Sequence, residues 1–379
     1  MDYPGKKSLK LHAKFKGKME IKIKVPLWTM ADLSLAYTPG VAEVCKKIAA
    51  NGALAKKYTI KNNTVAIITD GSAVLGLGNI GPLAALPVME GKAILHKRFA
   101  NIDAFPICLD TQDTEEIIRT VKNIAPVFAA IHLEDIAAPR CFEIERRLRA
   151  ELDIPVLHDD QHCTAVVVLA GLINALKVSR LNKAQANVVI NGAGGAGIAI
   201  GRLLLAYGFK NLVLLDSQGS IYRGRKGLSA EKLKLAKLTN RQKISGDLPA
   251  CLKNADIFIG VSKGGLLKAE MVKQMNKNPV IFALSNPIPE IMPAEAKKAG
   301  ARIIATGRGD FPNQINNVLV FPGLFRGALD NNVREITEAM LLKAANNLSA
   351  LVKFPTVHKI LPDLFDTSVA QAVAGAVKN

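Results

Sequence analysis

The sequence predicts an α/β protein with an N-terminal α/β domain followed by a second, doubly wound α/β domain. Three observations support this prediction. Apolar strands alternate with helical segments along the chain, two of these strands end in adjacent carboxylates, and a glycine-rich turn follows another strand. With 379 residues the chain is long enough for two domains, and we expect them to comprise residues 1–160 and 161–379.

The composition excludes several classes of protein. The net charge is +18, but only 5% of the residues are aromatic and no RNA-binding motif appears, so we expect the positive charge to attract small anions and not nucleic acid. The five cysteines are scattered, which is typical of a reducing compartment. The N-terminus has no apolar core of a signal peptide, and the apolar stretch at residues 165–176 is short for a bilayer. We expect a soluble cytoplasmic protein without a membrane partner.

The first 60 residues are rich in lysine and carry only short apolar runs. Residues 21–25 alternate like a short strand, and the turn signal at residues 39–40 places Tyr37 on a loop. A tyrosine near a turn is usually a packing residue, so this pattern alone assigns Tyr37 no role. A segment of this kind cannot bury a core of its own, and we expect it to lie against something larger.

The strand predicted at residues 65–70 leads into the glycine-rich residues 71–81, which contain a G-x-G-x-x-G pattern. Two prolines follow soon, and no acidic residue ends a second strand at the distance of a dinucleotide fingerprint. We therefore interpret this segment as a loop whose glycines let the backbone approach a ligand. Residues 89–99 are predicted to form a helix with Lys92 near its start, where the helix dipole would lower the pKa of the lysine. A solvated surface lysine is the alternative.

Two pairs of adjacent carboxylates follow the next two predicted strands. The strand at residues 127–133 ends in Glu134 and Asp135, and the strand at residues 155–158 ends in Asp159 and Asp160. Parallel strands end at the same edge of a sheet, so we expect the four carboxylates to gather there. Like charges in one crevice take up protons or are neutralised by a cation, and hard oxygens suit a divalent ion. Ordinary helix N-caps are the alternative explanation, and the nearby His162 is either a metal ligand or a support for the acids.

A second glycine-rich turn has the full context of a Rossmann-type dinucleotide site: a strand at residues 187–190, the turn, a helix at 198–207 and a strand ending in an acid. The glycines permit close approach of a pyrophosphate to the helix N-terminus. We expect NAD or NADP to bind here through Gly192, Gly194, Gly195, Ala196, Gly197 and Asp216. The carboxylate of Asp216 favours NAD, whereas the nearby Arg223, Arg225 and Lys226 would suit the 2′-phosphate of NADP.

Three further strands, predicted at residues 255–260, 279–284 and 301–305, should end at the same edge of the second sheet. The residues that follow them are then placed to touch the nicotinamide or a substrate. Two helices, at residues 332–352 and 367–377, complete the predicted chain.

Six segments, taken in this order, resemble malic enzymes, in particular the small-subunit bacterial kind. They are residues 34–41, 76–82, 90–92, 133–135, 159–162 and 285–287. The resemblance runs from about Lys22 to the C-terminal helix. It implies oxidative decarboxylation of L-malate to pyruvate and CO2 with NAD or NADP, in a homodimer that depends on Mg²⁺ or Mn²⁺. The first domain would then hold the substrate and the second the dinucleotide.

Carried over by motif, the resemblance also implies roles for single residues. Tyr37 would be the general acid and Lys92 the general base, with Asp159 as the partner of the lysine. The metal would be bound by Glu134, Asp135 and Asp160. Malate would be held by Asn286 and Asn317, and Ser262 and Asn286 would lie against the cofactor. We further hypothesise that the N-terminal segment crosses the two-fold axis, so that Tyr37 of one chain meets Lys92 of the other.

The chain departs from the family pattern at three places. Cys163 stands where the family has glycine, residues 261–265 differ from the usual nicotinamide loop, and Ala73 stands where larger malic enzymes place an arginine for the substrate carboxylate. Two other functions stay open at this point. One is another lysine-dependent Rossmann dehydrogenase, such as an amino-acid dehydrogenase, which needs no acid pairs. The other is a non-catalytic protein that binds NAD(P) or RNA.

Overall fold

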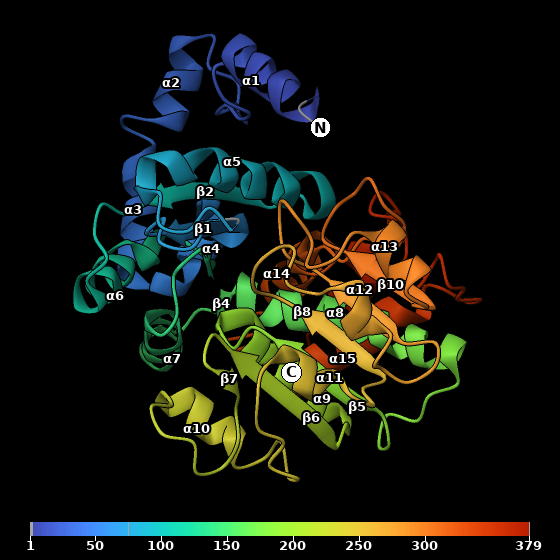
Figure 1. The fold of residues 1–379 in the computed structure, drawn as a ribbon. Helices are drawn as coiled ribbons and strands as arrows, with labels where there is room; N and C mark the ends of the chain where they lie inside the picture. The colour runs from blue at the N-terminus through green and yellow to red at the C-terminus, as the bar shows by residue number, and fades with distance from the viewer. Residues whose placement is uncertain (1–2, 75, 379) are drawn as a thin grey trace.

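Two parallel sheets form the framework of the protein (Figure 1). The computed structural model describes residues 3–74 and 76–378, so Leu75 of the glycine-rich segment 71–81 lies outside the described residues. The first sheet has the strand order β2-β1-β3-β4, and the second has the order β10-β9-β8-β5-β6-β7. Every strand pair is parallel except β6 with β7. The predicted α/β fold with a Rossmann-type second part is confirmed.

Helices cover both faces of the first sheet, whose strands are β1 (Thr64–Thr69), β2 (Asp103–Cys108), β3 (Ala130–Leu133) and β4 (Val156–His158). Successive side chains of a strand point to opposite faces. Val65 and Ile67 pack in the core that holds α5 (Gly81–Ala100), whereas Ala66 and Ile68 pack with α6 (Thr114–Ile124) and α7 (Arg140–Glu151). Both faces of β1 are buried, and its residues 65–68 accordingly form a continuous apolar run.

The order in which successive strands are added to the second sheet reverses at β5, which pairs with β6 on one side and with β8 on the other. Such a switch point is where α/β sheets bind ligands, and the glycine turn at residues 192–197 follows β5 directly. The strands are β5 (Asn187–Asn191), β6 (Asn211–Asp216), β7 (Gly219–Ser220), β8 (Ile257–Gly260), β9 (Val280–Ala283) and β10 (Ile303–Thr306). The helices packed around them are α9 (Gly195–Tyr207), α10 (Ala230–Ala236), α11 (Leu248–Leu252), α12 (Ala269–Val272) and α13 (Pro293–Lys298).

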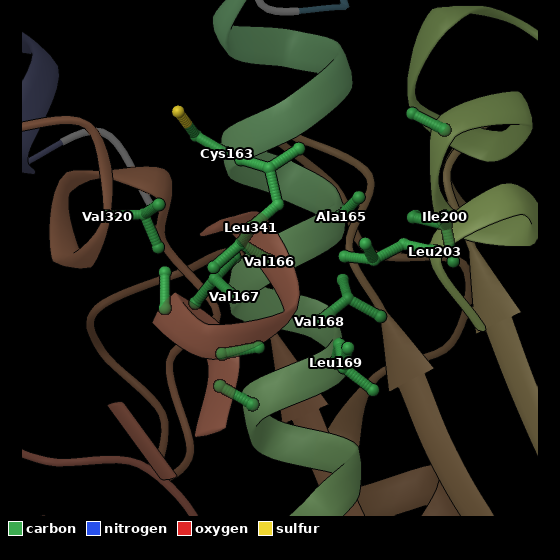
Figure 2. Close-up of a cluster of buried hydrophobic side chains, with 14 of the residues drawn as sticks. Cys163, Ala165, Val166, Val167, Val168, Leu169, Ile200, Leu203, Val320 and Leu341 are labelled. Atoms are coloured by element: carbon green, nitrogen blue, oxygen red, sulfur yellow. The ribbon is translucent and has the colours of Figure 1, made fainter. Parts of the chain in front are cut away.

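The helix α8 (Asp159–Ser179) runs from the end of the first sheet into the core of the second part. Figure 2 shows its residues Val166 to Leu169 facing side chains of α9, such as Leu203, and of α15, such as Leu341. We expected no segment long enough to span a bilayer, but α8 is long and apolar enough by length and composition. Since 72% of its apolar window is buried inside the protein, it is weak evidence for a membrane span and fits a core helix.

The N-terminal part stands apart from both sheets, with α1 (Tyr3–Phe15) and α2 (Met30–Ala36) above α5 in Figure 1. Residues 21–25 form no strand, contrary to our prediction, and Ile21 is 91% exposed. The alternating pattern was misleading because, in the part of the chain that the structure describes, no strand pairs with this segment. Two further helices, α3 (Val41–Ala50) and α4 (Ala55–Tyr58), connect this part to β1. Many of its apolar side chains are exposed, among them Leu9, Phe15, Ile23, Trp28, Met30, Leu35 and Tyr37.

Several predicted helix boundaries were wrong for identifiable reasons. The helix α5 begins at Gly81, eight residues earlier than predicted, because Pro82 stands in its first turn, where proline is favoured. The helix predicted from residue 332 begins at Glu338 (α15, Glu338–Ala350), after Thr337 caps it by accepting from the amide of Met340. A helix that we did not predict, α14 (Phe321–Asp330), precedes it, and the last helix is α16 (Ser368–Ala374). Short 3-10 turns occur at Gly52–Leu54, Ile60–Asn63, Ala125–Val127 and Asn317–Leu319.

Candidate active site

The four predicted carboxylates meet at the carboxyl edge of the first sheet. Glu134 and Asp135 follow β3, while Asp159 and Asp160 open α8 directly after β4, with which β3 is paired. The backbone amide of Asp135 donates to Oδ2 of Asp160 at 2.9 Å, which ties the two strand ends together. Glu134, Asp135 and Asp159 are at least 97% buried, whereas Asp160 is partly exposed.

Lys92 lies among these acids. Its Nζ is 3.0 Å from Oε1 of Glu134 and also contacts Oδ2 of Asp159. The same oxygen of Asp159 accepts from the side-chain amide of Asn317. The structure therefore brings together Lys92, Asp159, Glu134 and Asn317, which lie far apart in the sequence.

Our prediction for the pKa of Lys92 was wrong. Lys92 lies in the middle of α5 and not near its start, so the helix dipole gives no reason for a lowered value. Burial opposes its charge, but Asp159, Glu134 and Asp160 together raise the pKa of Lys92 above its ordinary value. For Glu134, burial and the neighbouring carboxylates Asp159, Asp160 and Asp135 outweigh Lys92 and raise its pKa well above the usual range. One lysine does not balance this cluster.

The donor set suits a divalent cation. Carboxylate oxygens of Glu134, Asp135 and Asp160 lie within 4.8 Å of one another, and a second group joins His132, Glu134 and Asp159 at the same spacing. Hard oxygen ligands are those that Mg²⁺ and Mn²⁺ prefer. Among the described residues, none hydrogen-bonds to the buried Oδ1 of Asp159, which also indicates that this cluster accommodates additional positive charge. The residues present therefore fit Mg²⁺ or Mn²⁺.

Two supporting interactions behind the acids were not predicted. Nε2 of His132 donates to Oε2 of Glu134 (2.7 Å), and its Nδ1 lies 2.9 Å from Nε2 of His96. Burial lowers the pKa of His132 to about 3. The sequence carries a signal for His132, because it is a polar residue inside an apolar strand. Glu145 of α7 accepts from the amide of His158 and contacts the ring of His162 at 2.9 Å. His162 thus contacts Glu145, which is in turn tied to the end of β4 through His158.

The dinucleotide turn borders a cavity of about 760 Å³. Its lining includes Gly192, Gly194 and Asp216, and α9 begins at Gly195. A Cβ at Gly197 would lie 1.7 Å from the carbonyl oxygen of Gly192, so only glycine fits there. Gly192 itself has a φ of 119°, a conformation that glycine adopts readily.

Asp216 is held by two cations. Arg225 contacts both of its carboxylate oxygens, at 2.8 and 2.7 Å, and Nζ of Lys232 lies 2.7 Å from Oδ2. Burial would raise the pKa of Asp216, but these hydrogen bonds lower it, so the carboxylate stays ionised. Our argument that Asp216 repels a 2′-phosphate was incomplete because this charge is offset. Arg223 and Lys226 are exposed, and Lys232 was not foreseen.

A second cavity, of about 550 Å³, lies beside the first and shares Ser262 with it. Lys92, Asn286 and Asn317 line it together with Glu134, Asp135, Asp160, Ala196 and Ala73. The loop at residues 261–265, whose sequence differs from the family pattern, is anchored by the buried Glu290. The carboxylate of Glu290 accepts from the amides of Ser262 (3.2 Å) and Ser285 (3.1 Å). Ser262 thus lies where a dinucleotide and a second small molecule would meet.

Two predicted positions lie outside this cavity as the structure describes it. Tyr37 caps the end of α2 and is 66% exposed, so one chain alone does not bring it to Lys92. Cys163 points from α8 into the core, and burial and the neighbouring Asp159 raise its pKa well above its usual range. This buried thiol is not among the described residues that line the cavity.

Comparisons with known proteins agree with this site. The model of the malic enzyme N-terminal domain matches residues 16–149, and that of the malic enzyme NAD-binding domain matches residues 162–379. The chain belongs to the malic enzyme family. The family predicted from the sequence is confirmed, and with it the predicted activity, oxidative decarboxylation of malate with NAD or NADP.

Close relatives include both kinds of cofactor dependence. The chain is 54% identical to a bifunctional malic/malolactic enzyme of Bacillus subtilis, covering 98% of this chain and 91% of the relative. It is also 54% identical to an NAD-dependent malic enzyme of Geobacillus stearothermophilus, over 95% and 76% of the two chains. The crystal structure of an NAD-dependent malic enzyme from Thermotoga maritima is similar, with a TM-score of 0.94, 49% identity and 98% coverage of both chains. That of the Entamoeba histolytica malic enzyme has a TM-score of 0.96 at 37% identity, covering 99% of this chain and 81% of the other.

Proposed function

We propose that this malic enzyme depends on Mg²⁺ or Mn²⁺ held by Glu134, Asp135 and Asp160, with Lys92 as general base, Asp159 as its partner and Tyr37 as general acid. The observation that carries the proposal is the cluster of buried carboxylates around Lys92, beside a dinucleotide turn. When bound, the metal supplies a Lewis acid and balances the carboxylates.

Lys92 is placed to take the proton of the malate hydroxyl while the hydride leaves the same carbon for the nicotinamide. A neutral amine is required for this. Asp159, Glu134 and Asp160 raise the pKa of Lys92, and a divalent cation held by Glu134 and Asp160 would offset this effect. The proton taken from malate then stays on Nζ, which contacts Asp159. Loss of CO2 leaves an enol of pyruvate, which needs a proton at the carbon that carried the carboxylate. The phenol of Tyr37 is the proposed donor.

Asn286 and Asn317 are proposed to hold malate, and Ser262 and Asn286 to contact the cofactor, because all three line the cavity next to the carboxylates. The turn formed by Gly192, Gly194, Gly195, Ala196 and Gly197 is proposed to take the pyrophosphate, and Asp216 the ribose hydroxyls of the adenosine. The predicted division into residues 1–160 and 161–379 is kept as a proposal. The five free cysteines suit the cytoplasm.

A homodimer with shared sites would bring Tyr37 to Lys92. Two features support this proposal: Tyr37 is exposed on a part of the chain that stands away from its own sheets, and that part exposes many apolar side chains. Large exposed apolar patches mark interfaces, and two-fold symmetry makes an exchange of segments reciprocal.

Mixing of two inactive variants tests the shared site. Tyr37→Phe and Lys92→Ala homodimers should each be nearly inactive, whereas a heterodimer would carry both lesions in one site and leave the other intact. Refolding an equal mixture should restore roughly a quarter of wild-type activity, since about half of the dimers are mixed and each has one good site. A mixture that is shown to contain heterodimers but recovers nothing would mean that each chain supplies its own tyrosine.

One assay tests the reaction. Malate and Mn²⁺ are supplied with NAD⁺ or NADP⁺ in parallel, reduction is followed at the nicotinamide, and pyruvate and lactate are both quantified because one relative is named a bifunctional malic/malolactic enzyme. EDTA should abolish turnover and Mn²⁺ restore it. Turnover that resists EDTA would instead favour a lysine-dependent dehydrogenase without a metal.

A further inference from the structure

Lys18 reaches the substrate cavity from the N-terminal part of the chain. It is one of the residues that line the cavity, and its Nζ donates to the carbonyl oxygen of Pro87 in α5. The adjacent Gly17 has a φ of 115°, and a Cβ there would lie 3.1 Å from a carboxylate oxygen of Glu90. This turn lets the segment pass close to α5, so the lysine is held over the cavity while most of its neighbours in sequence are exposed.

The side chain of Lys18 crosses α5 where the helix has no side chain of its own. A Cβ built on Gly91 would lie 3.7 Å from Nζ of Lys18, and Gly91 lines the cavity next to Lys92. Partial burial lowers the pKa of Lys18, with Glu90 opposing this effect. The ammonium group is therefore partly desolvated, which strengthens its attraction for an anion that enters the cavity.

Among the described residues that line this cavity, the cations are Lys18 and Lys92, and none is an arginine. Lys92 is already paired with two buried carboxylates. Malate enters with two carboxylates, and a carboxylate that loses its water needs a cation or several hydrogen-bond donors in exchange. Lys18 is therefore the second cation of the cavity lining, and none of the described carboxylates that line the cavity contacts it.

We propose that Lys18 binds a carboxylate of the dicarboxylic acid substrate and supplies the positive charge that the chain does not place at Ala73. The proposal rests on malate as the substrate. Lys18 is a binding residue and takes no part in proton transfer, so its charge should affect the binding of malate much more than the rate of turnover once malate is bound.

A charge series at this one position tests the proposal, after the wild-type enzyme has been shown to oxidise malate, which tests the function itself. Lys18→Met should raise the KM for malate roughly 10- to 100-fold, the usual effect of losing a hydrogen bond to a charged group. The value of kcat should change less than about threefold, and the KM for NAD⁺ should not change. Lys18→Arg should retain most of the affinity, and Lys18→Glu should weaken it further than Lys18→Met. Lys22→Met, which removes a lysine from an exposed position of the same segment, is the matched control and should behave like the wild type.

The outcome separates binding from a purely structural role. If Lys18 only fastens the segment to Pro87, then Lys18→Met and Lys18→Glu should be equally impaired, and the KM for malate and for NAD⁺ should rise together with a fall in melting temperature. Such a result, or a malate KM that stays at the wild-type value in Lys18→Met, overturns the proposal.

Discussion

The contacts of Asp216 predict how cofactor preference changes when this carboxylate is removed. In Asp216→Ser, the ribose loses an acceptor, while Arg225 and Lys232 lose the anion that they share. Arg225 also donates to the carbonyl oxygens of Gly219 and Ser220, both at 2.9 Å, so it should stay in place. The variant then presents two uncompensated cations where the 2′-phosphate of NADP would lie. We expect kcat/KM for NADP⁺ to rise relative to that for NAD⁺.

The size of the change follows from the exposure of the three side chains. They are about 10%, 11% and 24% exposed for Asp216, Arg225 and Lys232, so the freed charges are partly shielded from solvent. A charge-assisted contact of this kind contributes about 1.5–3 kcal/mol, and each 1.4 kcal/mol is a factor of ten. The ratio of the two specificity constants should therefore shift by roughly tenfold to a hundredfold towards NADP⁺, and by less at high ionic strength.

The assay measures initial rates with both dinucleotides at saturating malate and Mn²⁺. Asp247→Ser is the control, because Asp247 lines the same cavity but caps α11 and contacts neither cation in the described part of the chain. It should leave the ratio unchanged within about twofold. Adding Lys232→Ala to Asp216→Ser should remove much of the gain. A flat ratio in Asp216→Ser would show that the ribose does not lie at Asp216, and the reasoning would fail.

Three other perturbations have definite expected outcomes. Asp160→Asn should abolish metal-dependent turnover but leave NADH binding, followed by fluorescence titration, nearly unchanged; an equal loss of both would contradict separate metal and dinucleotide sites. Lys92→Ala should stop malate oxidation, whereas Tyr37→Phe should still reduce oxaloacetate with NAD(P)H. If Tyr37→Phe has lost this partial reaction as fully as it has lost decarboxylation of malate, the assignment of Tyr37 as general acid is refuted. Mn²⁺ at a hundred times its Kd should stabilise the fold by about 2.7 kcal/mol, measured as a rise in melting temperature that Asp160→Asn reduces.

The acid pairs could be predicted from the sequence because each one directly follows an apolar strand. Strand ends of a parallel sheet have a fixed place, so Glu134 and Asp160 could be brought together without any knowledge of packing. The glycine turn was predictable for the same reason, since its spacing carries the geometry of the pyrophosphate site. Tyr37 could be singled out only through the family resemblance.

Residues that act from a distance could not be predicted in this way. Lys18 and Lys232 reach the cavities through the path of the chain, and Glu290 accepts from the amide of the lining residue Ser262. No local pattern in the sequence sets these three apart from other charged residues. The predicted position of Lys92 near a helix start was wrong because residues 71–81 were interpreted as a loop and the helix was placed at 89–99, whereas Pro82 stands in the first turn of α5. The neutralisation of the Asp216 carboxylate by Arg225 likewise depends on a turn at β7, which the sequence did not predict.

The charges around the substrate cavity support the roles proposed for the two lysines and the asparagines. Glu134, Asp135 and Asp160 line this cavity with Lys92 and Lys18, and Asp159 contacts Lys92, so the two lysines and a divalent cation would together offset the four carboxylates. Net attraction alone would then discriminate poorly between malate and other small anions. We therefore propose that selection comes from directed contacts, made by the amides of Asn286 and Asn317 and the ammonium group of Lys18. A lysine on a separate segment of the chain would then change this selection without disturbing the carboxylates proposed to hold the metal.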